Sequence, residues 1–218
     1  MKHFTNSVET LKSRWENLLQ VLRVEPGLGQ EVFFELVTAY SSADRFYHNL
    51  EHIYHVLETI EQMHSLSLNF PLIQLAAWFH DVIYDPKTKN NEEKSAEYAQ
   101  VALNSLKIPK TKIETVTNLI LSTKTHQALP TDIESQILVD ADLAILGSSE
   151  SEYRSYAQAI RQEYSWIPDA DYRVGRKQVL QRFLQREKIY LTHQLFTALE
   201  EKARQNLQAE VAALSKEA

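Results

Sequence analysis

Three short segments of the sequence carry side chains that can bind a metal ion. They read RFYHNLEHIYHV, WFHDVIYD and VDADLAILG. The candidate ligands in them are His48, His52, His55, His80, Asp81, Asp140 and Asp142. Imidazole nitrogens combined with carboxylate oxygens suit divalent transition metals. The chain contains no Cys, which excludes a thiolate zinc site, a disulfide framework and a cysteine nucleophile. Any metal centre must therefore be built from the 8 His and the 29 acidic residues.

Helical periodicity separates the two late aspartates. Residues two apart on a helix point in nearly opposite directions, so Asp140 and Asp142 cannot serve one site from a regular helix. The apolar stripe of this helix contains Leu138, Ile145 and Leu146, at helical spacing from Asp142. Asp142 is thus expected on the apolar face, with Asp140 on the far side. A carboxylate aimed into a core favours a metal, and the alternative is a partner Arg or a helix N-terminus.

The same reasoning ranks the histidines. His52 lies closest to the apolar stripe of its helix and is expected to face inward, whereas His55 is expected on the surface. His48 is expected to precede the helix, where it would contact substrate or support the ligands. The pair His80 and Asp81 follows an apolar helix and suits a metal site. The alternative is a helix end where polarity resumes, with Asp81 in solvent.

The elements that must position these residues are predicted to be helices throughout. Only 4 Gly and 6 Pro occur in 218 residues, which leaves little room for hairpins or Gly-rich phosphate loops. Nine to ten helices are expected, over about 6–22, 30–40, 49–63, 71–82, up to 106, 109–124, 132–146, 150–164, 169–186 and 193–214. Asn6 with Glu9 and then Asn49 are predicted N-caps, and Gly147 a helix end. We expect a single all-α domain over 1–218, with an N-terminal helix pair (6–41), a metal-site core (45–147) and a C-terminal extension (149–214).

Composition limits the partners. The net charge is −6 and the 23 Lys and Arg are scattered among more acids, which argues against binding long nucleic acid. A small phosphorylated molecule needs only one or two local cations. No apolar stretch approaches the length that spans a membrane, and the N-terminal segment lacks a secretory pattern. We therefore expect a cytoplasmic protein that does not bind membranes. The C-terminal helix from His193 either docks on the core or pairs with a second subunit in a homo-oligomer.

Four ordered segments resemble the HD superfamily of metal-dependent phosphohydrolases, in particular its small stand-alone members. The family segments are YHNxxH, FHDxxYD, NEExSA and DADLAILG. Here they fall at Tyr47–His52, Phe79–Asp85, Asn91–Ala96 and Asp140–Gly147, and RQNL at Arg204–Leu207 extends the similarity. The resemblance implies a compact helical HD-type fold that hydrolyses a small phosphate ester, a nucleotide among the candidates.

By that resemblance the metal ligands are His52, His80, Asp81 and Asp142. The divalent ion would be Mn, Fe, Ni, Zn, Co or Mg, which this donor set does not distinguish. Many relatives bind a second metal through additional histidines. Here only His126 is available, and it is a second ligand, a proton donor or a surface residue.

The implied mechanism is attack by a metal-activated water. Asp81 would bind metal and orient the attacking group. Glu92, His126 and Lys124 are candidates to protonate or stabilise the leaving oxygen. Arg45, His48 and Lys124 are candidates for contact with the phosphate.

Two other classes of function remain open from the sequence. Some HD relatives hold two irons and oxidise their substrate, which needs a two-metal site that this chain has few histidines to build. A non-catalytic module that keeps a metal while sensing a ligand is the second alternative.

Overall fold

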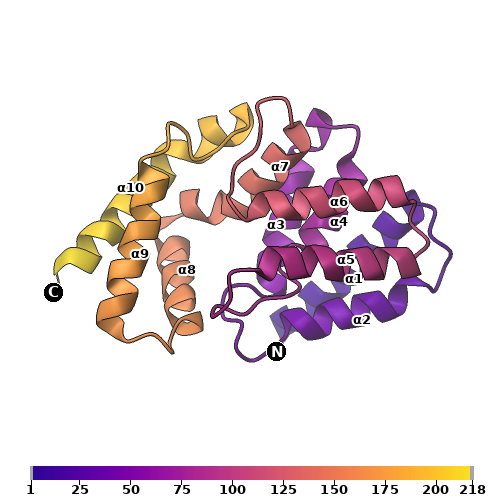
Figure 1. Ribbon diagram of the computed structural model, residues 1–218, viewed down its shortest axis with the longest axis horizontal. Coiled ribbons are helices and arrows are strands. Elements are labelled where there is room, and N and C mark those ends of the chain that lie inside the picture. Colours follow the sequence, from indigo (N-terminus) through magenta and orange to yellow (C-terminus); the bar gives the residue numbers. More distant parts are fainter. Residues whose placement is uncertain (1, 217–218) are drawn as a thin grey trace. The chain divides into compact units, whose positions relative to one another are not determined.

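The computed structural model describes residues 2–216, with side chains from residue 8 onward, and in this part of the chain helices are joined by loops with no β-strand (Figure 1). The elements are α1 (Lys2–Val21), α2 (Gly29–Tyr40), α3 (Leu50–Gln62), η1 (His64–Leu66), α4 (Phe70–Phe79), α5 (Asn91–Ser105), α6 (Lys110–Thr123), α7 (Ile133–Asp142), η2 (Leu143–Gly147), α8 (Glu150–Glu163), α9 (Asp169–Leu184) and α10 (His193–Lys216). The predicted all-α class is confirmed.

Two compact units divide the chain, and the boundary follows Ala141. The first unit contains α1 to α6 and nearly all of α7, and the second contains η2 and α8 to α10. The boundary therefore falls inside the predicted 45–147 core. That the whole chain forms one domain stays a prediction.

Helix α4 lies at the centre of the first unit. Its residues from Leu72 to Phe79 are buried except for Gln74, as expected of a helix without a polar face. The Trp78 ring packs edge-on against Trp15 of α1, with 5.5 Å between ring centroids. The predicted helix continued to Val82, but α4 ends at Phe79. The spacing of apolar residues extends beyond Phe79, where α4 ends, because Val82 is apolar and buried as well.

The N-terminal pair also differs from the prediction at its start. Helix α1 begins at Lys2, so Asn6 lies inside the helix and is not its N-cap. Helices α1 and α2 approach closely at Gly29, whose carbonyl accepts a hydrogen bond from Trp15 Nε1 at 2.9 Å. A Cβ atom at Gly29 would lie 2.0 Å from Leu19 Cδ1, so a larger residue would have to displace the Leu19 side chain.

The predicted helix over 132–146 is two elements. The α-helix ends at Asp142 and a 3₁₀ segment continues to Gly147. Residues from Ser135 to Ala141 are all buried, including Asp140, which has no exposed surface. The helical wheel placed Asp140 on the side of the helix away from Asp142, and that side is covered as well, since every residue from Ser135 to Ala141 is buried.

In the second unit, Arg204 hydrogen-bonds to the chain that connects α9 to α10. Arg204 of α10 donates to the carbonyls of Leu184, Arg186 and Glu187, and it pairs with Glu200 at 2.7 Å. Two residues further on, the Asn206 side chain donates to the carbonyl of Leu146 in η2 and to that of Ser148, just after η2. The RQNL segment thus has a structural role in this unit.

Arg176 of α9 is a buried cation in the second unit. Its side chain is 8% exposed and forms a two-pronged ion pair with Glu210 of α10, at 2.8 and 3.1 Å. Glu210 also accepts a hydrogen bond from the Tyr153 hydroxyl of α8. This cluster ties the three helices of the unit together.

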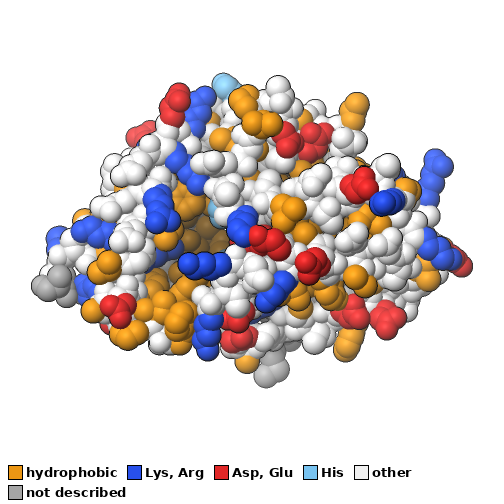
Figure 2. Space-filling model, in the orientation of Figure 1, with side chains coloured by type: hydrophobic (Ala, Val, Ile, Leu, Met, Phe, Trp, Pro, Cys, Tyr) orange, Lys and Arg blue, Asp and Glu red, His pale blue; other side chains and the backbone are white. Residues whose placement is uncertain are grey.

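Charges of both signs are interspersed with apolar side chains on the face drawn in Figure 2. Among the described helices, none has the length and apolar character needed to cross a bilayer.

Candidate metal centre

His52 is positioned by the N-terminus of α3. Asn49 is the N-cap, as predicted, and its Oδ1 accepts hydrogen bonds from the backbone N–H groups of Glu51 and His52. Its Nδ2 donates to the Phe46 carbonyl, which fixes the incoming chain. His52 occupies the first turn and is 4% exposed, so its ring faces inward.

His80 and Asp81 lie just beyond the C-terminus of α4, where helix carbonyls need outside donors. The His80 ring donates from Nδ1 to the Ala77 carbonyl at 2.9 Å. The Tyr40 hydroxyl donates to the Trp78 carbonyl at 2.9 Å, and Val82 N–H donates to the Phe79 carbonyl. The helix end that carries the ligands is thus fully hydrogen-bonded.

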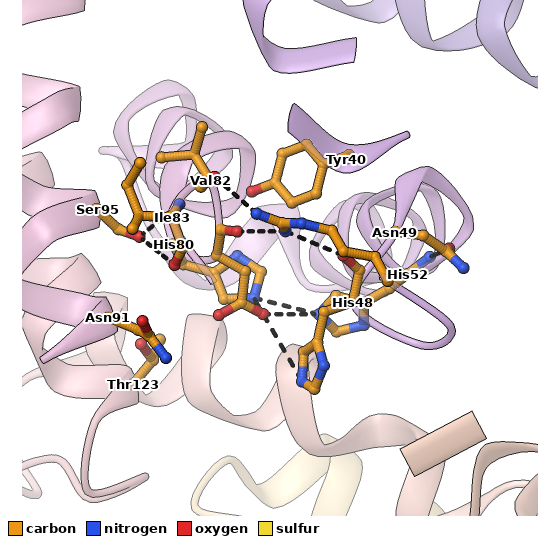
Figure 3. Close-up of polar contacts among 12 residues, drawn as sticks. Tyr40, His48, Asn49, His52, His80, Val82, Ile83, Asn91, Ser95 and Thr123 are labelled. Carbon is orange, nitrogen blue, oxygen red and sulfur yellow. Dashed lines mark hydrogen bonds and ion pairs between the residues drawn. The ribbon is translucent and has the colours of Figure 1, made fainter. Parts of the chain in front are cut away.

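Two further side chains fix the residues that follow. Arg45 donates to the carbonyls of Asp81 at 2.6 Å and Val82 at 2.7 Å. Ser95 of α5 is buried; it accepts from Ile83 N–H and donates to the Ile83 carbonyl (Figure 3). Three elements outside α4, the α2 end, the 41–49 loop and α5, therefore specify this turn.

The ligand atoms converge on one point (Figure 3). His52 Nε2 lies 3.2 Å from His80 Nε2, and Asp81 Oδ2 lies 3.1 Å from His80 Nε2 and 3.6 Å from His52 Nε2. Ligands at about 2.1 Å from one metal ion are separated by about 3.0–3.4 Å at octahedral or tetrahedral angles. Two of the three separations fall in this range, and the third, between His52 Nε2 and Asp81 Oδ2, is slightly longer at 3.6 Å.

The protonation of His80 strengthens this interpretation. A carbonyl only accepts, so the bond to Ala77 places the proton of the neutral ring on Nδ1 and leaves a lone pair on Nε2. That lone pair faces the Asp81 carboxylate oxygen at 3.1 Å, an unfavourable pairing unless a cation lies between them or the ring is charged. A carbonyl behind the distal nitrogen is also the usual support of a metal-bound histidine.

Asp142, the last residue of α7, completes the donor set. Among the described residues, His52, His80, Asp81 and Asp142 form a group whose ligand atoms all lie within 4.8 Å of one another. The group is the one predicted, with Asp142 and not Asp140 as its second carboxylate. Asp142 is half-buried, less deep than the helical wheel implied.

His48 borders the cluster without belonging to that group. It precedes α3, as expected, and its Nε2 lies 4.0 Å from Asp81 Oδ2. Its ring stacks on Tyr84, with 4.2 Å between centroids and 27° between planes. His55 is exposed on α3, as predicted, with 64% of its side chain in solvent.

The NEExSA segment has a visible structural role. Asn91 accepts from Asp85 N–H and Thr88 Oγ1 and donates to the Asp85 carbonyl, which closes the polar loop before α5. Together with Ser95, it holds the chain that leaves Asp81. Glu92 lies in the first turn of α5 and is half-buried.

The remaining predicted residues lie outside the metal group. Lys124 forms an ion pair with Glu93, and this hydrogen bond lowers the pKa of the Glu93 carboxyl. His126 follows α6 with a positive φ of 48°, in a loop. The structure does not bring it into the group that can hold a metal.

Sequence reasoning missed the residues that support the ligands. Arg45 was expected to contact phosphate, but its guanidinium donates to three backbone carbonyls, the third being that of His48 at 3.1 Å. Tyr40 was seen only as the end of a helix. The one available signal was the position of Arg45 within the RFYHN segment.

Comparison with known proteins found no relative of this chain. No protein-family model, no curated protein and no solved structure matches the chain.

Proposed function

We propose that the chain is a metal-dependent phosphohydrolase acting on a small phosphate ester, with nucleotides among the candidate substrates. The observation that carries the proposal is the convergence of two imidazole nitrogens and a carboxylate oxygen, all within 3.6 Å of one another. The order of the motifs, which resembles that of HD phosphohydrolases, supports the reaction class. The HD-type identity of the fold is part of this proposal.

His52, His80, Asp81 and Asp142 would hold one divalent ion, of the series Mn, Fe, Ni, Zn, Co or Mg. When bound, such an ion supplies a Lewis acid that acidifies water and offsets charge on phosphoryl oxygens. The Ala77 carbonyl keeps the His80 proton on Nδ1, so that Nε2 stays available as a ligand. Single occupancy is favoured because His126 lies outside the group.

The neighbouring side chains supply substrate contacts. His48 presents Nε2 at 4.0 Å from Asp81 Oδ2 and can hydrogen-bond a phosphate oxygen there. Stacking on Tyr84 restricts rotation of its ring. Glu93 stays ionised because of Lys124, and this pair offers the phosphate a cation held in place. Glu92 and His126 are the proposed donors of a proton to the leaving oxygen.

The test is metal content per chain, measured by mass spectrometry on protein purified without added metal. His52→Ala and its matched control His55→Ala remove histidines one turn apart on α3, one buried and one exposed. We expect about one ion per chain in the wild type and in His55→Ala, and loss of the ion in His52→Ala. A screen of phosphate esters with the added metal should then find turnover that His52→Ala lacks.

The other outcomes identify the alternatives. Two irons per chain with oxygen uptake would replace the proposal with a di-iron oxygenase. Tight metal with no turnover on any phosphate ester would favour a sensing module. Metal content indifferent to His52 would overturn the centre itself.

A further inference from the structure

The Arg45 guanidinium donates hydrogen bonds to backbone carbonyls around the candidate metal centre. Its Nη1 donates to the carbonyls of His48 at 3.1 Å and Asp81 at 2.6 Å, and its Nη2 donates to Val82 at 2.7 Å. One planar group therefore links the loop before α3 to the turn after α4 (Figure 3). These two segments are 36 residues apart in sequence.

Aromatic rings hold the guanidinium itself. Its central carbon lies 5.0 Å from the centroid of Tyr40 and 5.6 Å from that of Tyr84. Tyr40 also bonds to the Trp78 carbonyl, and Tyr84 stacks on His48. The guanidinium of Arg45 thus lies against two rings that themselves contact the site.

The bonded carbonyls decide where Asp81 points. Fixing the carbonyls of Asp81 and Val82 fixes the two peptide planes after Asp81, and hence the backbone from which its carboxylate projects. The bond to the His48 carbonyl sets the second segment against the first.

We propose that Arg45 is a positioning residue that preorganises Asp81 for metal binding and sets His48 beside it, through its fork geometry and not through its charge. The inference rests on the proposed metal centre. A lysine keeps the charge but cannot reproduce a planar fork that serves three carbonyls. Arg45→Lys therefore separates geometry from charge.

The experiment measures the affinity of metal-stripped protein for Mn²⁺ alone, together with the electron paramagnetic resonance spectrum of the bound ion. The variants are Arg45→Lys and Arg45→Gln. Arg14→Lys is the matched control, because Arg14 also lies 5.0 Å from a tyrosine centroid but bonds to the Glu58 carboxylate. Circular dichroism without metal reports whether each variant folds.

We expect the dissociation constant to rise about 10- to 100-fold in both Arg45 variants, the usual loss when the support of a ligand is removed. The spectrum should broaden, and Arg14→Lys should match the wild type. Wild-type affinity in Arg45→Lys would overturn the role of the fork. Loss of helical signal in both Arg45 variants would assign the residue to folding and overturn the proposal as well.

The two proposals fail in different ways. If wild-type protein binds neither Mn²⁺ nor any other divalent ion, the metal centre is wrong and this inference falls with it. If wild-type protein binds Mn²⁺ and the Arg45 variants bind equally well, only the inference is wrong.

Discussion

The His80 ring directs an unprotonated Nε2 toward the Asp81 carboxylate, because its Nδ1 proton is committed to the Ala77 carbonyl. His52 adds a second nitrogen 3.2 Å away. A divalent cation here would bind all three atoms together in the folded chain, and the unfolded chain does not bring them together. The arrangement therefore links the stability of the folded chain to metal binding.

Chelation should accordingly lower the melting temperature of the wild-type protein. An ion present at 100 times its dissociation constant stabilises the fold by about 2.7 kcal/mol, which corresponds to roughly 5–10 °C for a chain of this size. Differential scanning calorimetry with and without a chelator checks this. In Asp142→Ala the chelator should have little effect, and an equal shift in that variant would contradict the assignment of Asp142 as a ligand.

The ligands were predictable from sequence because each carries its own signal. His52 and Asp142 stood near apolar stripes, and His80 with Asp81 followed an apolar helix. Arg45 and Lys124 were assigned to phosphate on nearness in sequence alone. That criterion does not reveal the local acceptors that the structure shows, which are backbone carbonyls for Arg45 and Glu93 for Lys124. A role of either cation toward phosphate stays a prediction.

At the scale of the elements, the turn after α4 depends on α5. Ser95 is buried and bonds to both the N–H and the carbonyl of Ile83, two residues after Asp81. This contact joins α5, which contains none of the four candidate ligands, to the turn that contains Asp81. α5 lies beside α6, which in turn packs on α4 (Figure 1).

Ser95→Ala should destabilise the fold by about 1–3 kcal/mol, because it leaves two buried backbone groups without this partner. Urea denaturation followed by circular dichroism measures the change. Ser155→Ala is the control, since Ser155 is exposed and bonds only within its own helix. Its effect should stay within about 0.5 kcal/mol. Equal stabilities for the two variants would mean that the Ser95 bonds contribute nothing.

Helix existence was predictable, and helix ends were less so. The Asn49 cap was recognised because an N-cap is a local signal. The end of α4 was placed three residues late because Tyr40, Arg45 and Ser95, which stabilise the turn, come from elsewhere in the chain. The change from the α-helix α7 to the 3₁₀ helix η2 after Asp142 likewise cannot be read from the spacing of apolar residues.

Across the whole molecule, tyrosine hydroxyls pair with glutamates in both compact units. In the first unit, burial and a hydrogen bond to Glu35 raise the pKa of Tyr98. In the second, burial first and then the charge of Glu210 raise the pKa of Tyr153. Sequence spacing within α9 does not reveal the burial of Arg176, because its partner Glu210 lies 34 residues away on α10.

Alkaline pH should therefore weaken the fold within a defined window. Burial raises the pKa of Tyr172 to about 12, whereas an unfolded tyrosine titrates near 10.0. Between these values the unfolded chain loses a proton that the folded chain keeps, so the free energy of unfolding falls as pH rises from 10 to 12. Below pH 10 both states are protonated, and this group leaves stability unchanged.

Urea denaturation at a series of pH values measures this fall, and Tyr172→Phe isolates the contribution of one hydroxyl. The variant removes the titrating group while keeping the ring that packs against Arg161, with 4.6 Å between the guanidinium carbon and the ring centroid. Its stability should decline less steeply than that of the wild type above pH 10. Since Tyr98 and Tyr153 still titrate in the variant, part of the decline should remain. A wild-type curve that stays flat to pH 12 would show that these hydroxyls ionise as freely in the folded chain as in the unfolded one.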